Sequence, residues 1–200
     1  MNHLTHQTSE IQVVPATAER WNDLEQLFGK KGASAGCWCM FWRLKRSDSS
    51  KLKGEGNKAI LKEMTLANQV PGVLAYAART AIGWCSIGPR QDYLALENSR
   101  LLQRVDDQPV WSIVCFFVNK NFRKQGVKRA LLAGAGEYAI SQGARIIEAY
   151  PIDMQSELLQ GKRLTGYSGY MGIASVFRAL GFVEVRRASE TQLIMRYSVP

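Results

Sequence analysis

The chain of 200 residues carries 26 lysine and arginine residues against 17 aspartate and glutamate residues, and 46% of its residues are hydrophobic. This composition is typical of a soluble globular protein that is long enough to bury a substantial core. No apolar run approaches the roughly 20 residues of a membrane span, and residues 1–10 lack the apolar core of a signal peptide, so we expect a cytoplasmic protein with no membrane partner. The net charge of +9 favours an anionic partner, either a nucleotide cofactor or a nucleic acid.

The positions of the histidines and cysteines disfavour catalytic or metal sites built from these residues. Both histidines, His3 and His6, lie in the polar tail of residues 1–10, which we expect to be disordered. Ser-His and Cys-His nucleophile pairs and histidine metal sites are therefore not expected in the folded part of the chain. The four cysteines are too few and too scattered for a disulfide framework or a zinc site, and we expect no bound metal.

Three regular elements are predicted before residue 70. They are a strand at residues 11–14, a helix between Thr17 and Gly29, and a helix at residues 57–68. In each helix, apolar residues recur at helical spacing and should face the core. These residues are Trp21, Leu24, Leu27 and Phe28 in the first helix, and Ile60, Leu61, Met64 and Ala67 in the second.

Between these helices, residues 30–50 lose periodicity but contain the densest aromatic and sulfur cluster of the chain. Two interpretations of Trp38, Met40 and Trp42 are open, and both can hold at once. The three side chains can close the end of the hydrophobic core. Alternatively, they can form the wall of a substrate pocket, because tryptophan and methionine offer large, adaptable apolar surfaces to ligands.

The middle of the chain predicts a hairpin followed by a central strand. Residues 72–78 and 80–87 have the pattern of two antiparallel strands, and residues 92–105 look helical in part. Residues 110–118 are β-branched and aromatic with almost no charge, as expected of a buried central strand. The helix that follows has one apolar stripe, formed by Val127, Leu131, Ala135 and Tyr138.

The loop between this strand and this helix has the properties of an anion-binding site. The first turn of a helix leaves up to four N–H groups unpaired, and the helix dipole makes that end partly positive. Gly126 allows a bound group to approach the backbone, and cations surround it at Arg123, Lys124, Lys128 and Arg129. The alternative is a solvated basic face on an ordinary connection.

The last part of the chain completes a mixed sheet. Residues 145–150 predict a strand parallel to the strand at 110–118, because a crossover helix connects the two. Residues 153–170 form a polar connection whose length suits a loop that covers a ligand. The remaining elements are a short helix and a hairpin, at residues 172–180, 183–188 and 193–197.

Two motifs resemble those of the GNAT superfamily of N-acetyltransferases. Arg123-x-x-Gly126-x-Lys128 resembles the pyrophosphate-binding motif A, usually Gln/Arg-x-x-Gly-x-Gly/Ala. Lys128 takes the last small-residue position, so its side chain must point away from the phosphates or reach back to bind them. The run from Phe177 to Phe182 resembles motif B, usually Tyr-x-x-x-Gly-Phe. The resemblance implies one GNAT-like α/β domain over residues 11–200, an α+β mixed sheet flanked by helices, whose two central parallel strands splay apart.

The same resemblance implies acetyl-CoA as the acyl donor. In that family the pantetheine arm fills the gap between the splayed strands by pairing with exposed strand backbone, and such pairing satisfies groups that would otherwise stay unpaired. The matching residues here are Phe116, Phe117 and Val118. The pyrophosphate would lie on the basic loop and the start of the helix, at Arg123, Lys124, Gln125, Gly126, Val127, Lys128 and Arg129.

The catalytic groups are predicted from the needs of the reaction. Direct attack on a thioester requires a neutral amine and gains from a proton donor near the departing thiolate. Phe177 stands where the family commonly has the donor tyrosine, and it can only pack. We predict Tyr170 as the donor, at a position where the family often has asparagine, and Ser175 as the second choice. The alternatives are that Tyr170 is a packed tyrosine, that Ser175 is an exposed serine, and that the reaction uses no donor. Glu148 is the best carboxylate for the base, with a cross-strand ion pair as its alternative. We expect Cys115 to be a core residue rather than a nucleophile.

The leading hypothesis is therefore an N-acetyltransferase that moves an acetyl group from acetyl-CoA to a primary amine of a small molecule or peptide by direct attack. One alternative is a GNAT-like protein that binds acyl-CoA without transfer, or that acylates another group such as a hydroxyl. Another is a basic nucleic-acid-binding protein, which is disfavoured because the basic residues are not interleaved with exposed aromatics. The acceptor and the oligomeric state stay open, and a homodimer is one of the options.

Overall fold

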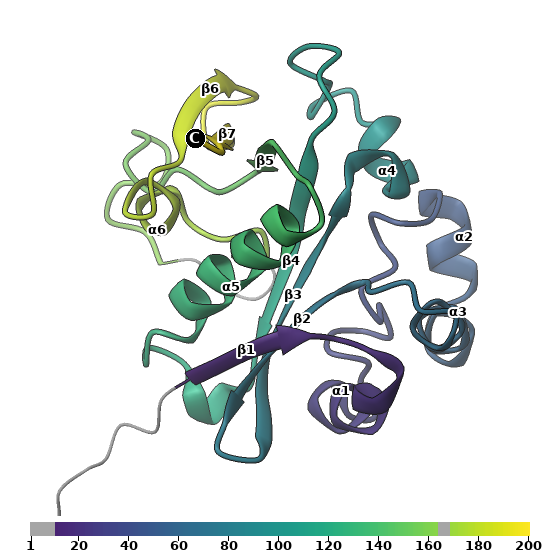
Figure 1. The fold of residues 1–200 in the computed structure, drawn as a ribbon. Coiled ribbons are helices and arrows are strands. Elements are labelled where there is room, and N and C mark those ends of the chain that lie inside the picture. Colours follow the sequence, from purple (N-terminus) through teal and green to yellow (C-terminus); the bar gives the residue numbers. More distant parts are fainter. Residues whose placement is uncertain (1–10, 164–168) are drawn as a thin grey trace, which may run out of the picture.

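The computed structural model describes residues 11–163 and 169–200, so the predicted tail at residues 1–10 lies outside the described residues. All described strands belong to one seven-stranded sheet of order β1-β2-β3-β4-β5-β7-β6 (Figure 1). The strands are β1 (Ile11–Pro15), β2 (Gly72–Ala77), β3 (Thr80–Pro89), β4 (Trp111–Val118), β5 (Ile146–Ala149), β6 (Val183–Arg187) and β7 (Leu193–Ser198). Among them, only the β4–β5 pair is parallel. The mixed sheet with a parallel central pair confirms the predicted fold class.

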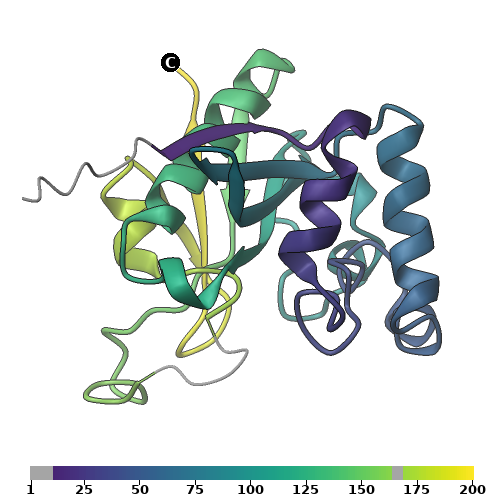
Figure 2. The ribbon, with the colours of Figure 1, turned by 90° about the horizontal axis from the view of Figure 1, so that it is seen from below.

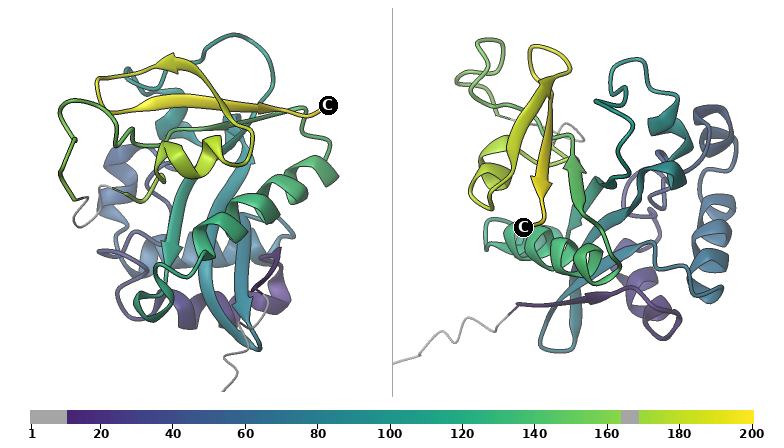
Figure 3. Two further views of the ribbon diagram at one scale, coloured as in Figure 1. Left: turned by 90° about the vertical axis from the view of Figure 1, so that its left-hand side faces the viewer. Right: turned by 45° about the horizontal axis from the view of Figure 1, so that its top comes forward.

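Helices cover both faces of this sheet. The helices α5 (Val127–Ser141) and α6 (Ala174–Arg178) lie on one face, which Figure 3 shows from the front in its left panel. On the other face α1 (Trp21–Phe28) and α3 (Glu55–Leu66) lie side by side (Figure 2). The connections contain α2 (Arg46–Lys51), α4 (Leu94–Glu97) and the 3-10 turns Ala18–Arg20, Arg90–Asp92 and Lys120–Phe122. None of the described helices is both long and apolar enough to cross a membrane.

Burial follows the predicted periodicity fully in α1 and in part in α3, where Ile60 and Met64 are partly buried against the core. All four predicted core residues of α1 are buried. In α3, by contrast, Leu61 is buried whereas Ala67 is exposed just past the end of the helix, and two polar residues, Asn57 and Thr65, are buried instead. The Asn57 amide donates to the carbonyl oxygens of Gly36 and Ser49 at 3.1 and 3.0 Å. These two hydrogen bonds pair the N–H groups of the buried amide, and hydrophobic periodicity alone does not predict such a buried polar side chain.

The two central parallel strands separate after a short contact. β4 pairs with β5 only over Trp111–Ile113, opposite Ile147–Ala149. Val114 is an extra residue in the pairing with β3, because Ile113 and Cys115 face consecutive residues of that strand. Such a β-bulge bends the strand that carries it. β4 then continues to Val118 without pairing to β5, as the splayed arrangement of the resembled family requires.

Candidate functional site

A segment of residues 169–173, the bridging segment, lies between the separated strands. On one side, the Phe116 N–H of β4 donates to the Tyr170 carbonyl oxygen at 2.6 Å. On the other side, the Ile152 N–H, just after β5, donates to the Gly172 carbonyl oxygen at 3.0 Å. The edge of β4 that was predicted to pair with pantetheine is therefore paired here with the protein's own backbone.

The basic loop presents an open helix N-terminus next to this gap. Gly126 caps α5 with φ of +78°, a left-handed conformation that favours glycine, and a Cβ there would meet no atom within 4 Å. Among the described residues, no acceptor pairs with the backbone N–H groups of residues 127–129, whereas the Ala130 N–H donates to the Gly126 carbonyl oxygen at 3.1 Å. Exposed cations flank these groups at Arg123, Lys124 and Arg129. The arrangement can hold an anion by both hydrogen bonds and charge.

Lys128, the departure from the family's motif, reaches the bridging segment. Its Nζ donates to the Gly169 carbonyl oxygen at 2.9 Å. Burial lowers the pKa of Lys128 below its ordinary value. The side chain therefore links the start of α5 to the segment that occupies the gap between β4 and β5.

A cavity of about 220 Å³ lies beside the bridging segment. Its walls include Phe41, Trp42, Arg46, Leu102, Tyr170 and Met171. Trp42 and Met171 pack with Val114 of β4 in one hydrophobic cluster, so the cavity adjoins the bulge. Burial raises the pKa of Tyr170 to about 12. The Trp42 indole N–H approaches this phenol, yet it makes no hydrogen bond of normal geometry with any described residue.

The three residues predicted to form one pocket wall are separated in the structure. Trp38 is only 4% exposed and packs on Trp21 and Phe28, with ring centroids 6.2 and 5.6 Å away, in the core beneath α1. Met40 is fully buried and contributes to a different cavity, of about 550 Å³, next to Arg43. Trp42 alone lines the cavity beside the bridging segment. The three residues therefore do not form one shared wall: Trp38 matches the alternative of closing the core, Met40 lines the other cavity, and a role of either in acceptor binding stays a prediction.

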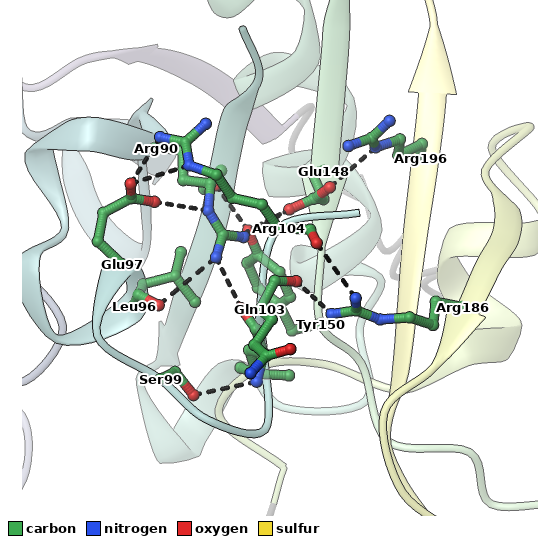
Figure 4. Close-up of polar contacts among 12 residues, drawn as sticks. Arg90, Leu96, Glu97, Ser99, Gln103, Arg104, Glu148, Tyr150, Arg186 and Arg196 are labelled. Carbon is green, nitrogen blue, oxygen red and sulfur yellow. Dashed lines mark hydrogen bonds and ion pairs between the residues drawn. The ribbon is translucent and has the colours of Figure 1, made fainter. Parts of the chain in front are cut away.

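Glu148 lies in a buried ion network instead of facing the gap (Figure 4). Its side chain is 0% exposed, and its two oxygens accept from Arg90 Nη1 at 2.7 Å and from Arg196 Nε at 2.8 Å. The Tyr150 hydroxyl donates to the same carboxylate at 2.7 Å. Arg196 is directly opposite Glu148 in the β5–β7 register. These contacts match the ion-pair alternative, and the general-base role of Glu148, direct or through water, stays a prediction.

The same network fixes one wall of the cavity. Arg90 also donates from Nη2 to the Leu102 carbonyl oxygen at 2.6 Å and from Nε to Glu97 at 2.7 Å. The Leu102 N–H in turn donates to the Ser99 hydroxyl oxygen at 3.0 Å. Figure 4 shows how Arg90 lies between α4 with its following loop and Tyr150 with Glu148. The guanidinium thus holds the 96–102 loop against β5.

The structure also places three other residues that the sequence analysis considered, Ser175, Phe177 and Cys115. Ser175 is exposed on α6, which matches the alternative of an exposed helix serine, and its donor role stays a prediction. Phe177 is buried between Phe116 and Phe182, with ring centroids 6.1 and 5.3 Å away, so it packs as predicted. Interaction with the Cys39 thiol and burial raise the pKa of the Cys115 thiol well above its ordinary value. A thiol kept protonated in this way is a poor nucleophile.

Sequence reasoning missed two arginines that shape the site. Arg46 lines the cavity with its guanidinium 5.5 Å from the Phe41 ring centroid and 5.9 Å from that of Trp42. Arg46 follows Trp42 by four residues and Phe41 by five, and this spacing is only a weak sequence signal for contact between the guanidinium and the two rings. Arg90 directly follows a predicted strand that ends at Gly88-Pro89, and nothing local reveals that its partners lie far along the chain.

Comparisons with known proteins agree with this geometry. A family profile described as the acetyltransferase (GNAT) family matches residues 38–156, more than half of the chain. The crystal structure of the PaiA N-acetyltransferase from Thermoplasma acidophilum in complex with coenzyme A is 13% identical, with 95% of this chain and 99% of that chain covered and a TM-score of 0.52. A GNAT family acetyltransferase from Listeria monocytogenes 4b F2365 is 11% identical, with 99% and 100% covered and a TM-score of 0.55. At these identities the structures share the fold. A search of curated proteins finds no match.

Proposed function

The chain belongs to the GNAT family of acetyltransferases, and we propose that it transfers an acetyl group from acetyl-CoA to a primary amine of a small molecule or peptide by direct attack. One observation carries the proposal: the backbone of β4 leaves β5 after Ile113 and leads directly to an open helix N-terminus at Gly126. An extended chain could pair along Phe116–Val118 and end in a diphosphate on the N–H groups of residues 127–129. The pantetheine and pyrophosphate of coenzyme A have this order and chemistry.

Acyl-CoA binding, in this proposal, requires the bridging segment to leave β4. The Phe116 N–H can donate to only one acceptor at a time, and it now donates to Tyr170. Its release would free the strand edge, and it would also free Lys128 from the Gly169 carbonyl oxygen. Lys128 would then be available to the phosphates, which is the second of the two roles considered for it above.

The reaction can proceed without a general base or a strong general acid. The amine nitrogen bonds to the acetyl carbon, the carbon–sulfur bond breaks, and the proton lost by nitrogen ends on the coenzyme A sulfur through solvent. While the bridging segment lies on β4, burial raises the pKa of Tyr170 to about 12, so the phenol keeps its proton at neutral pH. It is too weak an acid to transfer that proton fully to a thiolate, since thiol pKa values lie near 8.5. Proximity and orientation then supply most of the rate enhancement.

The test is a pair of substitutions at Gly126, measured by calorimetry with acetyl-CoA. Gly126→Asp should weaken affinity by about tenfold or more, because it places a negative charge beside the phosphates. Gly126→Asn is the matched control, since asparagine is of the same size, is neutral and tolerates positive φ. It should bind acetyl-CoA within about twofold to threefold of wild type.

Equal affinity in the Asp and Asn variants would refute the phosphate assignment. Binding of acetyl-CoA without turnover of any amine in a broad panel would support the non-catalytic alternative. Salt-sensitive binding of DNA, together with no binding of acetyl-CoA, would support the nucleic-acid alternative.

A further inference from the structure

The cavity beside the bridging segment has a composition that points to one class of acceptor. We propose that it binds the acceptor amine, and that this acceptor is a compact molecule with an apolar body and a carboxylate, such as an aromatic or aliphatic α-amino acid. The inference rests on the proposed acetyltransferase function. It deepens that function by naming the substrate class.

The size and walls of the cavity favour a compact apolar ligand. Its volume of about 220 Å³ lies below the roughly 300–1,000 Å³ typical of sites for drug-sized ligands. Aromatic rings form much of the wall, at Phe41, Trp42 and Tyr170, with Leu101 and Leu102 beside them. Such a wall accommodates one aromatic or branched aliphatic side chain, and it offers little to a long polar chain.

The polar side chains of the cavity are one cation, Arg46, and the neutral groups of Trp42, Tyr170, Ser99 and Gln192. Arg46 is the charged residue among those that line it, and Arg46 takes part in none of the ion pairs between described residues. The Trp42 side chain is 95% buried, and its indole N–H has no hydrogen-bond partner among the described residues. A buried N–H without a partner is costly unless a ligand supplies an acceptor. A ligand carboxylate would satisfy the indole and pair with the guanidinium.

The cavity also lacks what a cationic acceptor would need. None of its lining residues in the described part of the chain carries a carboxylate. A polyamine, or the ammonium of a lysine-rich peptide, would enter beside Arg46 without a counter-charge. The apolar walls lower the pKa of an amine bound there, because burial disfavours its charged form. The site itself can therefore help to deliver the neutral amine, although Glu148 is occupied elsewhere.

One wall of the cavity is held in place before any ligand arrives. Arg90 binds the Leu102 carbonyl oxygen, and the Leu102 N–H binds Ser99, so the 99–102 loop is fixed to β5 through the ion network (Figure 4). A preformed wall reduces the ordering cost of binding. The two groups on which the argument depends, Trp42 and Arg46, lie outside the bridging segment and stay in place if that segment moves.

The experiment compares amino acids with their decarboxylated amines, with and without the Arg46 charge. Binding is followed by saturation-transfer NMR and turnover by thiol release from acetyl-CoA, using phenylalanine, tyrosine, leucine and methionine, the amine derived from each, and spermidine. At least one amino acid should bind and be acetylated more efficiently than its amine and than spermidine. Arg46→Gln should raise the KM of that amino acid about tenfold or more and that of its amine less than twofold.

Two further variants make the test specific. Lys51→Gln removes an exposed cation from the other end of α2 and should change neither KM. Trp42→Phe keeps an aromatic ring but removes the indole N–H. It should weaken binding of the amino acid more than binding of its amine, and circular dichroism checks that the variant is folded. The proposal is overturned if every decarboxylated amine binds as tightly as its amino acid, or if Arg46→Gln affects both members of a pair equally. Calorimetry of the wild-type protein with acetyl-CoA alone separates the two proposals. If acetyl-CoA does not bind, the acetyltransferase proposal fails, whatever the result for amino acid binding.

Discussion

At the scale of single residues, the packing neighbours of each aromatic side chain, and not its degree of burial, decide which of them can meet a ligand. Trp38 and Trp42 are four residues apart and both nearly buried, yet they belong to different hydrophobic clusters. Trp38 has φ of +46°, an uncommon conformation for a large side chain, and this turn directs it into the core with Trp21 and Phe28. Trp42 packs near β4 and lines a cavity. The two residues should therefore respond to substitution in opposite ways.

Trp38→Ala should lower the free energy of unfolding by about 3–5 kcal/mol, because it removes a buried ring and leaves a cavity beside Trp21 and Phe28. The KM values for acetyl-CoA and for the acceptor should stay within about twofold of wild type. Urea titration and steady-state kinetics measure the two effects, and Trp38→Phe serves as a milder variant if the alanine variant does not fold. A rise in the acceptor KM alone, with unchanged stability, would restore the pocket-wall interpretation.

At the scale of elements, a buried ion network joins parts of the chain that the sheet alone does not connect. Glu148 of β5 pairs with Arg196 of β7 and with Arg90, which follows β3. Arg196 also binds Asp106 through both carboxylate oxygens, at 2.6 and 3.0 Å. The connection between β3 and β4 is therefore fixed to the β5–β7 pair. Because this connection forms one wall of the cavity, the network positions the candidate acceptor site without facing it.

Glu148→Gln should destabilise the fold by about 3 kcal/mol, since it leaves two arginines in and around the core without their shared counter-charge. Glu184→Gln is the matched control: it removes the same charge from an exposed pair with Arg187, where about 0–1 kcal/mol is expected. If Glu148 were the general base, Glu148→Gln would abolish the acidic limb of the pH profile of kcat/KM. We expect that limb to stay unchanged at a temperature where the variant is folded.

At the scale of the whole molecule, the net charge of +9 means that basic side chains outnumber acidic ones, so a carboxylate often has an arginine or a lysine as its partner. Asp106 shows the effect on ionisation, because its hydrogen bonds from Arg196 lower its pKa to about 2. The hydrogen bond from Lys58 likewise lowers the pKa of Glu25. In the unfolded chain these groups would titrate near 3.9 and 4.3. A carboxyl whose pKa is lower in the folded state stabilises that state at pH values above its unfolded pKa, and this contribution is lost as the pH falls towards the folded pKa.

The free energy of unfolding should therefore fall as the pH is lowered from about 4 to about 2. Asp106→Asn should be less stable than wild type at pH 7, and its stability should depend less steeply on pH within this window. Urea titrations at several pH values between 2.5 and 7 provide the measurement. An identical pH slope in wild type and Asp106→Asn would show that this carboxylate is not a source of the acid sensitivity.

The sequence by itself determined the fold class, the order of most elements and the place of the basic loop before a helix, because these depend on local signals. The stripe from Trp21 to Phe28 repeats at helical spacing, the strand before residue 118 is continuously apolar, and Gly126 stands where a helix begins. Each signal is contained within one element and needs no knowledge of its neighbours. The short helix α2 was missed for the same reason, since its polar residues carry no periodicity.

Only the tertiary structure decided which residues meet in the site. The separation of Trp38 from Trp42, the pairing of Glu148 with two arginines, and the placement of residues 169–173 against Phe116 all depend on contacts between elements far apart in the sequence. A carboxylate on a strand has the same local pattern whether it faces a ligand or a buried guanidinium. Which of the two it meets is set by long-range packing, and the spacing of residues along the chain does not record it.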